Sequence, residues 1–139
     1  MLEGISHITF VVKDLDRTTA LFKELFNAKE VYYSGEKTHS LYKERFFLIG
    51  GHWIALMESE NIVNKTYHHV AFKINEEDVD DYVTKIQDLK LEMKPPRPRI
   101  QGEGYSIYFY DYDHNLFELH TGTLEERIAS YKTVDNGGA

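Results

Sequence analysis

The sequence predicts an α+β fold built from two consecutive copies of one βαβββ module. Three observations support this prediction. A strand-like segment at residues 7–12 returns at residues 69–74, 62 positions later. Each copy is followed by acidic residues and then by an amphipathic helical pattern, and each helix is followed by short strand-like segments between turn residues. An internal repeat of this size indicates a duplicated structural unit.

In the first module, β-branched and aromatic residues predict the opening strand at residues 7–12. Asp14 and Asp16 follow, and acidic residues suit a helix N-terminus, where free N–H groups and the helix dipole favour them. The helix itself is predicted from apolar residues on one side, namely Leu21, Phe22, Leu25 and Phe26. Three further strands are expected at residues 30–33, 40–49 and 53–58, with a turn at Gly50-Gly51.

The second module follows the same plan. Its first strand, residues 69–74, precedes the acidic run Glu76-Glu77-Asp78 and a helical pattern formed by Val79, Tyr82, Val83 and Ile86. Further strands are expected at residues 91–94, 105–110 and 116–121, with the matching turn at residues 111–115. Prolines and glycines at residues 95–104 predict a long irregular loop, which in a small domain is more often functional than idle.

The 139 residues correspond to one domain. We expect that domain to span residues 1–132, with half-modules at about 5–58 and 67–120 joined by residues 59–66. A terminal helix is expected at about 123–131, and residues 133–139 are expected to form a flexible tail.

Composition excludes several classes of function. The chain has 16 Lys and Arg against 23 Asp and Glu, and a net charge of -7 disfavours binding to nucleic acid or to an anionic membrane. No apolar run approaches a membrane span, and residues 1–6 lack the pattern of a signal peptide, so a cytoplasmic location is expected. With no cysteine, disulfides, thiolate metal sites and cysteine nucleophiles are excluded.

Strand periodicity groups the polar residues by face, because residues two apart point the same way. His7 then shares a face with Thr9, Tyr67 with His69, Ser106 with Tyr108, and Glu118 with His120. The 62-residue offset aligns His7 with His69, Glu44 with Ser106, and Leu56 with Glu118. Two histidines and one glutamate match the facial-triad ligand set, which leaves coordination positions open for substrate.

A purely structural role for these residues is the competing interpretation. A single histidine in a strand is more often a structural residue than a ligand, and a single glutamate is usually solvated. Two histidines at equivalent positions, together with Glu118 among apolar neighbours, are hard to explain as independent accidents. The pattern therefore predicts a metal site formed by His7, His69 and Glu118. His68 is interpreted as structural, and a supporting role for His120 stays open.

The tandem modules and these residues resemble the vicinal oxygen chelate superfamily, and within it the fosfomycin-resistance proteins of the FosX type, which are epoxide hydrolases. The resemblance covers residues 1 to about 132. It is carried by Ser6-His7-Ile8-Thr9, Lys43-Glu44-Arg45-Phe46-Phe47, Trp53-Ile54, residues 66–72, residues 102–111 and residues 117–127.

The resemblance implies a homodimer in which modules pair across chains. The metal would be Mn(II), with other divalent ions left open by a nitrogen and oxygen ligand set, and it would be held by His7 of one subunit with His69 and Glu118 of the other. The substrate would be fosfomycin, a phosphonate epoxide opened at C1 by water. Glu44, in the matching segment, would be the general base, although a solvated strand charge is its alternative interpretation.

The resemblance also implies residues that bind the substrate. Arg127, Ser106 and Tyr108 would bind the phosphonate, and Thr9, Trp53 and Tyr67 would line the pocket. Arg97 and Arg99 could add positive field, but ordinary surface charge explains them as well. Pro98 and Gly102 replace the Lys and Ser of the potassium-binding loop in related thiol transferases, which argues against that branch.

Three alternatives remain at this stage. A metal-dependent thiol transferase would open the same epoxide with glutathione or bacillithiol, and it would have no use for a base at Glu44. A glyoxalase-like isomerase would need a second carboxylate ligand where Leu56 is aligned. A drug-sequestering protein of another class would bind without chemistry, and the complete triad argues against it.

Overall fold

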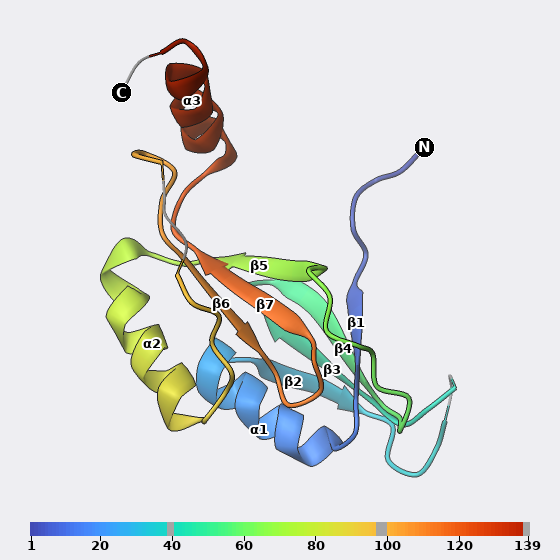
Figure 1. Cartoon of the computed structure of the whole chain (residues 1–139). Helices are drawn as coiled ribbons and strands as arrows, with labels where there is room; N and C mark the ends of the chain where they lie inside the picture. The colour runs from blue at the N-terminus through green and yellow to red at the C-terminus, as the bar shows by residue number, and fades with distance from the viewer. Residues whose placement is uncertain (39–40, 97–99, 138–139) are drawn as a thin grey trace. The chain divides into compact units, whose positions relative to one another are not determined.

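The computed structural model describes residues 1–38, 41–96 and 100–137. Its contacts divide the chain into two compact units, Met1–Lys65 with Asp111–Asn115, and Thr66–Tyr110 with Leu116–Ala139. Each unit contains one sheet, with one α-helix in the first unit and two in the second (Figure 1). No helix in the described part of the chain is long and apolar enough to cross a membrane.

The first unit is a four-stranded sheet with one helix. Its elements are β1 (Ile8–Val12), α1 (Leu15–Phe26), β2 (Lys29–Tyr33), β3 (Glu44–Ile49) and β4 (His52–Glu58), with the strands in the order β1-β4-β3-β2. β1 and β4 are parallel, whereas the other neighbours are antiparallel. Asp14 caps α1 by accepting from the Arg17 N–H at 3.0 Å, as the acidic residues there predicted.

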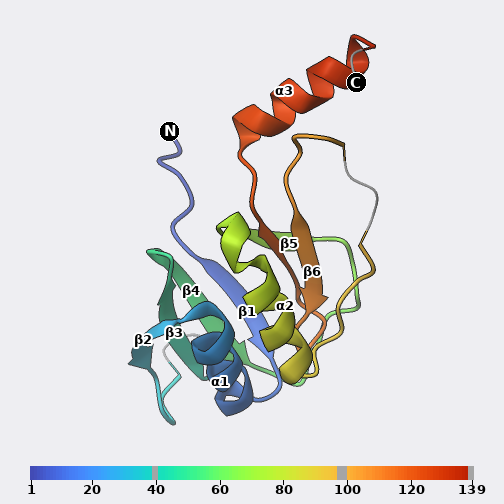
Figure 2. The same cartoon turned by 90° about the vertical axis from the view of Figure 1, so that its left-hand side faces the viewer.

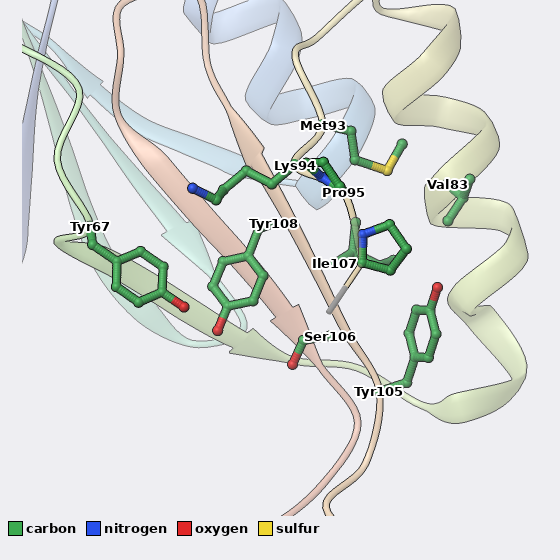
Figure 3. Close-up of a pocket in the computed structure, with 10 residues that line it drawn as sticks. Tyr67, Val83, Met93, Lys94, Pro95, Tyr105, Ser106, Ile107 and Tyr108 are labelled. Atoms are coloured by element: carbon green, nitrogen blue, oxygen red, sulfur yellow. The ribbon is translucent and has the colours of Figure 1, made fainter. Parts of the chain in front are cut away.

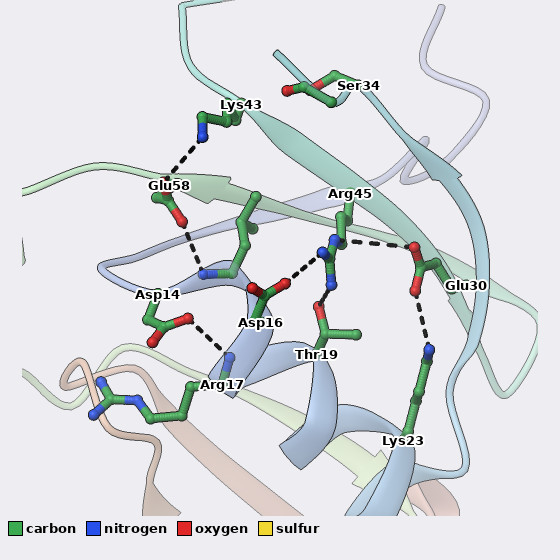
Figure 4. A network of polar contacts seen from close by, with 12 residues as sticks. Asp14, Asp16, Arg17, Thr19, Lys23, Glu30, Ser34, Lys43, Arg45 and Glu58 are labelled. Atoms are coloured by element: carbon green, nitrogen blue, oxygen red, sulfur yellow. Dashed lines mark hydrogen bonds and ion pairs between the residues drawn. The ribbon is translucent and has the colours of Figure 1, made fainter.

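One face of this sheet forms the apolar core with α1. Phe22 of α1 and Phe47 of β3 are both fully buried, and their rings meet at 5.6 Å between centroids. Figure 4 shows the polar contacts that hold the same elements together at the rim. There, Arg45 of β3 donates to Asp16 at 2.6 Å and to Thr19 at 2.8 Å, both on α1. Arg45 therefore fixes β3 against the helix.

The second unit is a three-stranded sheet with two helices. Its elements are β5 (His69–Lys73), the 3-10 turn η1 (Glu76–Asp78), α2 (Val79–Asp88), β6 (Ser106–Tyr110), β7 (Leu116–His120) and α3 (Leu124–Asp135). The strand order is β5-β7-β6, with β5 parallel to β7 and β6 antiparallel to it. Figure 2 shows α2 alongside this sheet and α3 beyond the end of β7.

Two expectations about elements were wrong. Residues 91–94 do not form a strand: Met93 makes one isolated bridge to Phe109, and the Lys94 N–H donates to the Tyr108 carbonyl at 2.8 Å. Pro95 and Pro96 follow directly and have no N–H to extend the ladder. The terminal helix continues to Asp135, into the segment expected to be a tail. β3 begins at Glu44, and part of the strand predicted from residue 40 lies outside the described residues.

Candidate metal centre and substrate site

The strand register places the predicted residues of the first unit on one face of its sheet. Thr9 and Phe46 both lie opposite Ala55 of β4. Glu44 lies opposite Met57, two positions further along β4. Since opposed residues share a face and alternate residues return to it, Thr9 and Glu44 belong to the same face. This face is the one turned away from the α1 core.

His7 and Trp53 extend that face at the start of β1 and β4. Their rings stack with centroids 4.1 Å apart, and Trp53 also meets Phe46 edge-on at 5.2 Å. The Ser6 hydroxyl lies 3.0 Å from His7 Nδ1. Because that contact occupies Nδ1, the Nε2 atom of His7 is the nitrogen left for a metal ion.

Glu44 is a buried carboxylate, 7% exposed. Its backbone is held by Ser34: the Glu44 N–H donates to Ser34 Oγ at 3.0 Å, and the Ser34 N–H donates to the Glu44 carbonyl at 3.0 Å. Its carboxylate makes no hydrogen bond or ion pair with any of the described residues. The neighbouring Arg45 points to the opposite face, where it contacts α1. A buried carboxylate of this kind is suited to accept a proton from a bound water.

The second unit gathers its predicted residues in the same way. Glu118 of β7 lies opposite both Ala71 of β5 and Tyr108 of β6, and Ser106 lies opposite His120. His69 is two residues from Ala71 and therefore shares their face. The expectation that these side chains point the same way is thus met by the register.

His69 and Glu118 form the central pair of this face. His69 Nε2 lies 3.0 Å from Glu118 Oε1. His69 Nδ1 lies 2.7 Å from the Tyr67 carbonyl, which can only accept, so Nδ1 carries the proton. In neutral His69 the lone pair of Nε2 then faces a carboxylate oxygen, and this arrangement requires a cation, either a proton or a metal ion, between the two atoms.

Glu118 is only 4% exposed, and burial by itself raises the pKa of its carboxyl group. Hydrogen bonds from Ser106, at 2.5 Å to Oε2, and from Tyr108, together with the electrostatic effect of His120 and His69, outweigh burial, so the pKa of Glu118 lies below its ordinary value. Glu118 is therefore ionised at neutral pH, as a metal ligand must be.

Tyr108 remains a neutral phenol at neutral pH. Burial, together with hydrogen bonds to Tyr67 and Glu118, raises the pKa of Tyr108. The Tyr108 ring also packs against the rings of Tyr67, at 5.8 Å, and His69, at 5.3 Å. Its hydroxyl therefore keeps its proton and donates toward Glu118, beside the contact of His69 with the same carboxylate.

A pocket of about 130 Å³ opens beside these residues (Figure 3). Pockets for drug-sized ligands hold about 300–1,000 Å³, so this one suits a small ligand. It is lined by Tyr67, Val83, Met93, Lys94, Pro95, Pro96, Tyr105, Ser106, Ile107 and Tyr108. Three of these, Tyr67, Ser106 and Tyr108, were predicted to bind substrate.

Lys94 is a charged pocket residue that the sequence analysis missed. Its Nζ lies 5.5 Å from the ring centroid of Tyr67 and 5.9 Å from that of Tyr110. It brings a positive charge to a pocket that also holds the Ser106 and Tyr108 hydroxyls. The only sequence signal was its place directly before the proline-rich loop. Arg97 and Arg99, considered for this role, lie outside the described residues.

Arg127 of α3 contacts the same network from the far side. Its Nη2 lies 3.1 Å from His120 Nε2, and His120 Nδ1 lies 2.6 Å from Ser106 Oγ. Arg127 has five N–H donors, so the bond to His120 leaves others for an anion. A direct contact of Arg127 with a phosphonate stays a prediction.

The register corrects one alignment. Ala71 is equivalent to Thr9, and the residues opposite them are Glu118 and Ala55, so the counterpart of Glu118 is Ala55 and not Leu56. Leu56 points to the other face and is fully buried. Counted between equivalent paired residues, the segment that joins β6 to β7 is one residue longer than the segment that joins β3 to β4. Equivalent residues in the last strands of the two units, β4 and β7, are therefore 63 positions apart instead of 62. Ala55 offers no ligand atom, so a second carboxylate ligand is still missing.

The predicted ligands fit a divalent metal ion by their chemistry. His69 Nε2 and the Glu118 carboxylate face each other across 3.0 Å, and His69 Nδ1 is held by a carbonyl, as is usual for metal-bound histidines. His7 belongs to the first unit, and His69 and Glu118 belong to the second. Among the described residues, no three His, Cys, Asp or Glu side chains of the single chain form a metal-binding group.

Comparison with known proteins shows the superfamily that the chain resembles and its relatives within it. Residues 4–119 match the model of the Glyoxalase/Bleomycin resistance protein/Dioxygenase superfamily. The fosfomycin resistance protein FosX of Listeria monocytogenes is 56% identical over 131 residues, covering 94% of this chain and 98% of the relative. The metallothiol transferase FosB of Shouchella clausii is 38% identical, covering 95% and 89%.

A solved structure agrees with both findings. A mutant of FosX from Listeria monocytogenes, complexed with Mn(II) and 1S,2S-dihydroxypropylphosphonic acid, superposes with a TM-score of 0.87 at 58% identity, covering 93% of this chain and 99% of the other. The chain belongs to the glyoxalase superfamily, and within it to the family of FosX fosfomycin resistance proteins. The predicted α+β fold of duplicated modules and the predicted family are thereby confirmed.

Proposed function

We propose that the chain is a Mn(II)-dependent hydrolase that adds water to C1 of the fosfomycin epoxide and so confers fosfomycin resistance. The observation that carries the proposal is the buried Glu44 carboxylate, which lies on the same face as His7 and has no partner among the described residues. The similarity to FosX, and the Mn(II) and dihydroxypropylphosphonic acid in the FosX structure, support it.

His7, His69 and Glu118 would hold the metal ion. A bound Mn(II) would supply Lewis-acid stabilisation of the negative charge that develops on the epoxide oxygen. The Nδ1–H contact of His69 with Tyr67 orients its Nε2, and the Ser106 hydroxyl occupies Oε2 of Glu118 so that Oε1 faces His69. These contacts keep the donor atoms in place before substrate arrives.

Glu44 would be the general base. Its carboxylate takes a proton from water while the water oxygen forms a bond to C1 and the bond from C1 to the epoxide oxygen breaks. That oxygen then receives a proton, which gives the diol; the net reaction adds one water molecule to the epoxide. The burial of Glu44 favours this role, because a base shielded from bulk water holds its nucleophile in one orientation.

The phosphonate would be bound by Arg127, Ser106 and Tyr108, with Thr9, Trp53 and Tyr67 along the pocket. Ser106 and Tyr108 line the pocket with their hydroxyl protons directed at Glu118, so the positive charge for the phosphonate comes from Arg127 and from Lys94, which the sequence analysis did not assign. Arginine and lysine are suited to a phosphonate, since arginine can donate to two oxygens and lysine adds a compact charge.

The assembly is part of the proposal. We propose that residues 1–132 act as one domain and that two chains form a homodimer, with His7 of one copy completing the site of the other. The three ligands lie in two units of the chain, as this arrangement requires. A cytoplasmic location, expected from the sequence, belongs to the proposal as well.

Phosphorus NMR tests the reaction. The protein is incubated with fosfomycin and Mn(II), without any thiol, and a parallel sample contains glutathione or bacillithiol. The proposal predicts a diol signal in both samples. A phosphonate adduct that appears only with thiol would instead support a thiol transferase, the activity named for the 38% identical relative. Mn(II)-dependent binding without any product would support a sequestering protein.

The base assignment has its own variant. Glu44→Gln keeps the size and polarity of the side chain but cannot accept the proton, so we expect hydration to fall by a factor of about 100 or more. Mn(II) affinity should be unchanged, because Glu44 is not a proposed ligand. Normal turnover in Glu44→Gln would refute Glu44 as the base.

A further inference from the structure

A chain of buried side chains runs behind the proposed metal ligand Glu118. The Ser106 hydroxyl lies 2.5 Å from Glu118 Oε2 and 2.6 Å from His120 Nδ1. On the other side of its ring, His120 Nε2 lies 3.1 Å from Arg127 Nη2. Ser106 is 9% exposed, Glu118 4% and His120 9%, so bulk water does not compete for these contacts.

The donor and the acceptor of each hydrogen bond follow from Arg127 and Glu118, the residues at the two ends of this series of contacts. Arg127 can only donate, so His120 Nε2 accepts and the ring proton is on Nδ1. At the other end, the ionised Glu118 can only accept, so Ser106 donates its single proton there. Ser106 must then accept from His120 Nδ1, and the two deductions agree.

The backbone leaves room for the His120 ring at one glycine. A Cβ added to Gly122 would lie 2.8 Å from His120 Nε2 and 2.9 Å from the Glu103 carbonyl oxygen. Both distances are shorter than normal contacts, so a side chain at Gly122 would displace the ring or the loop. The ring of His120 is therefore seated between backbone and hydrogen-bond partners on both of its nitrogens.

We propose that His120 is a positioning residue that serves both halves of the site. Its Nδ1–H keeps the Ser106 hydroxyl directed at Oε2 of Glu118, which leaves Oε1 for the metal ion. Its Nε2 holds the guanidinium of Arg127, whose remaining N–H groups are then oriented for the phosphonate. The second half of this inference rests on the proposed function, whereas the first half concerns metal binding alone.

Two substitutions of similar size separate the two contacts. In His120→Asn the amide reaches only the position of Nδ1, so it can donate to Ser106 but does not reach Arg127. In His120→Gln the amide extends to the position of Nε2, so it can accept from Arg127 but leaves Ser106 without its donor. Each variant therefore keeps one contact and serves as the control for the other.

Mn(II) affinity is measured without substrate, from the electron paramagnetic resonance signal of the free ion. We expect His120→Gln to weaken Mn(II) binding by about 10- to 100-fold, the usual effect of removing a group that orients a ligand, and His120→Asn to leave it nearly unchanged. The KM for fosfomycin should show the reverse pattern, rising in His120→Asn. Equal Mn(II) affinities in the two variants would overturn the proposal.

Ser106→Ala provides a second measurement if a His120 variant does not fold. It removes the short contact with Oε2 of Glu118 and leaves only the 3.5 Å approach of His120 Nδ1 to that oxygen. It should therefore weaken Mn(II) binding at least to the same degree, and adding His120→Gln should weaken it by much less than the sum of the two separate losses. Unchanged Mn(II) affinity in Ser106→Ala, or additive losses in the double variant, would contradict the proposed link from His120 through Ser106 to Glu118. These affinities do not depend on turnover, so a failure of the hydrolase proposal is recognised separately by NMR.

Discussion

At the scale of single residues, the contact between His69 and Glu118 is the most informative feature. Two groups that both present lone pairs lie 3.0 Å apart, and the remaining atoms of each are fixed by Tyr67 and Ser106. Hydrogen bonds and the nearby His120 and His69 together favour the ionised form of Glu118 strongly enough to overcome burial. The pair is thus prepared for a cation before any cation binds.

The lowered pKa of Glu118 predicts an acid-side loss of stability in the metal-free protein. For a carboxyl group whose folded pKa lies below the unfolded value of 4.5, the stabilisation is complete above pH 4.5 and is lost as the pH falls through the folded pKa. Glu118→Gln should therefore show a smaller decrease of Tm between about pH 5 and pH 3 than the unchanged chain.

The matched control is Glu3→Gln, which removes an exposed carboxylate near the N-terminus. Thermal unfolding is followed by circular dichroism across the same pH range, without Mn(II). If Glu118→Gln and Glu3→Gln had the same dependence of Tm on pH, the hydrogen bonds to Glu118 would not stabilise its ionised form.

At the scale of elements, strand register decides which residues meet. Periodicity in the sequence was enough to predict that Ser106 and Tyr108 point the same way, and that Tyr67 and His69 do. The alternation of side chains within a strand depends only on neighbouring residues. Which residue of one module corresponds to which residue of the other could not be predicted in this way, because it depends on the length of the loop between the strands. One additional residue in the second hairpin moved the counterpart of Glu118 from Leu56 to Ala55, and a shift of one residue reverses the face.

The register makes a prediction about Leu56. Its side chain is fully buried on the α1 face, so Leu56→Ala should lower the free energy of unfolding by about 2–5 kcal/mol. Mn(II) affinity of the folded variant should not change, since Leu56 lies on the face opposite His7. Chemical denaturation measures the first quantity and Mn(II) titration the second. Intact stability with weakened Mn(II) binding would mean that the face assignment is wrong.

Side-chain networks were beyond the reach of sequence patterns. The link from Glu118 through Ser106 and His120 joins strands β6 and β7 to Arg127 on α3, and each contact depends on rotamers. Lys94 was missed for a related reason. It was assigned to a strand that prolines prevent, and its place in the pocket depends on the irregular loop that replaces the strand.

At the scale of the whole molecule, the three predicted ligands belong to two different units of the chain. The proposed homodimer explains this division, because each site would combine His7 of one copy with His69 and Glu118 of the other. A symmetric dimer of this kind contains two such sites, each built from both chains.

Complementation between inactive variants tests the shared site. His7→Ala and Glu118→Ala should each be inactive, because each removes a ligand from both sites. In a mixed dimer, one site would contain both defects and the other would be intact. Coexpression in equal amounts should therefore restore about a quarter of the full activity, since about half of the dimers are mixed.

If each site were instead formed within one chain, every site in the mixed dimer would lack one ligand and no activity would return. The control is coexpression of Glu118→Ala with His69→Ala. These two residues lie in the same unit, so that mixture should stay inactive in either arrangement.

The most direct test of the central claim is to run the reaction in water labelled with oxygen-18 and to locate the label in the product by NMR. With Mn(II) present and no thiol, a hydrolase that opens the epoxide at C1 places the label on the C1 hydroxyl of the diol, and Glu44→Gln forms little or none of it. Label on the C2 hydroxyl, or no diol without added thiol, would contradict the proposed reaction.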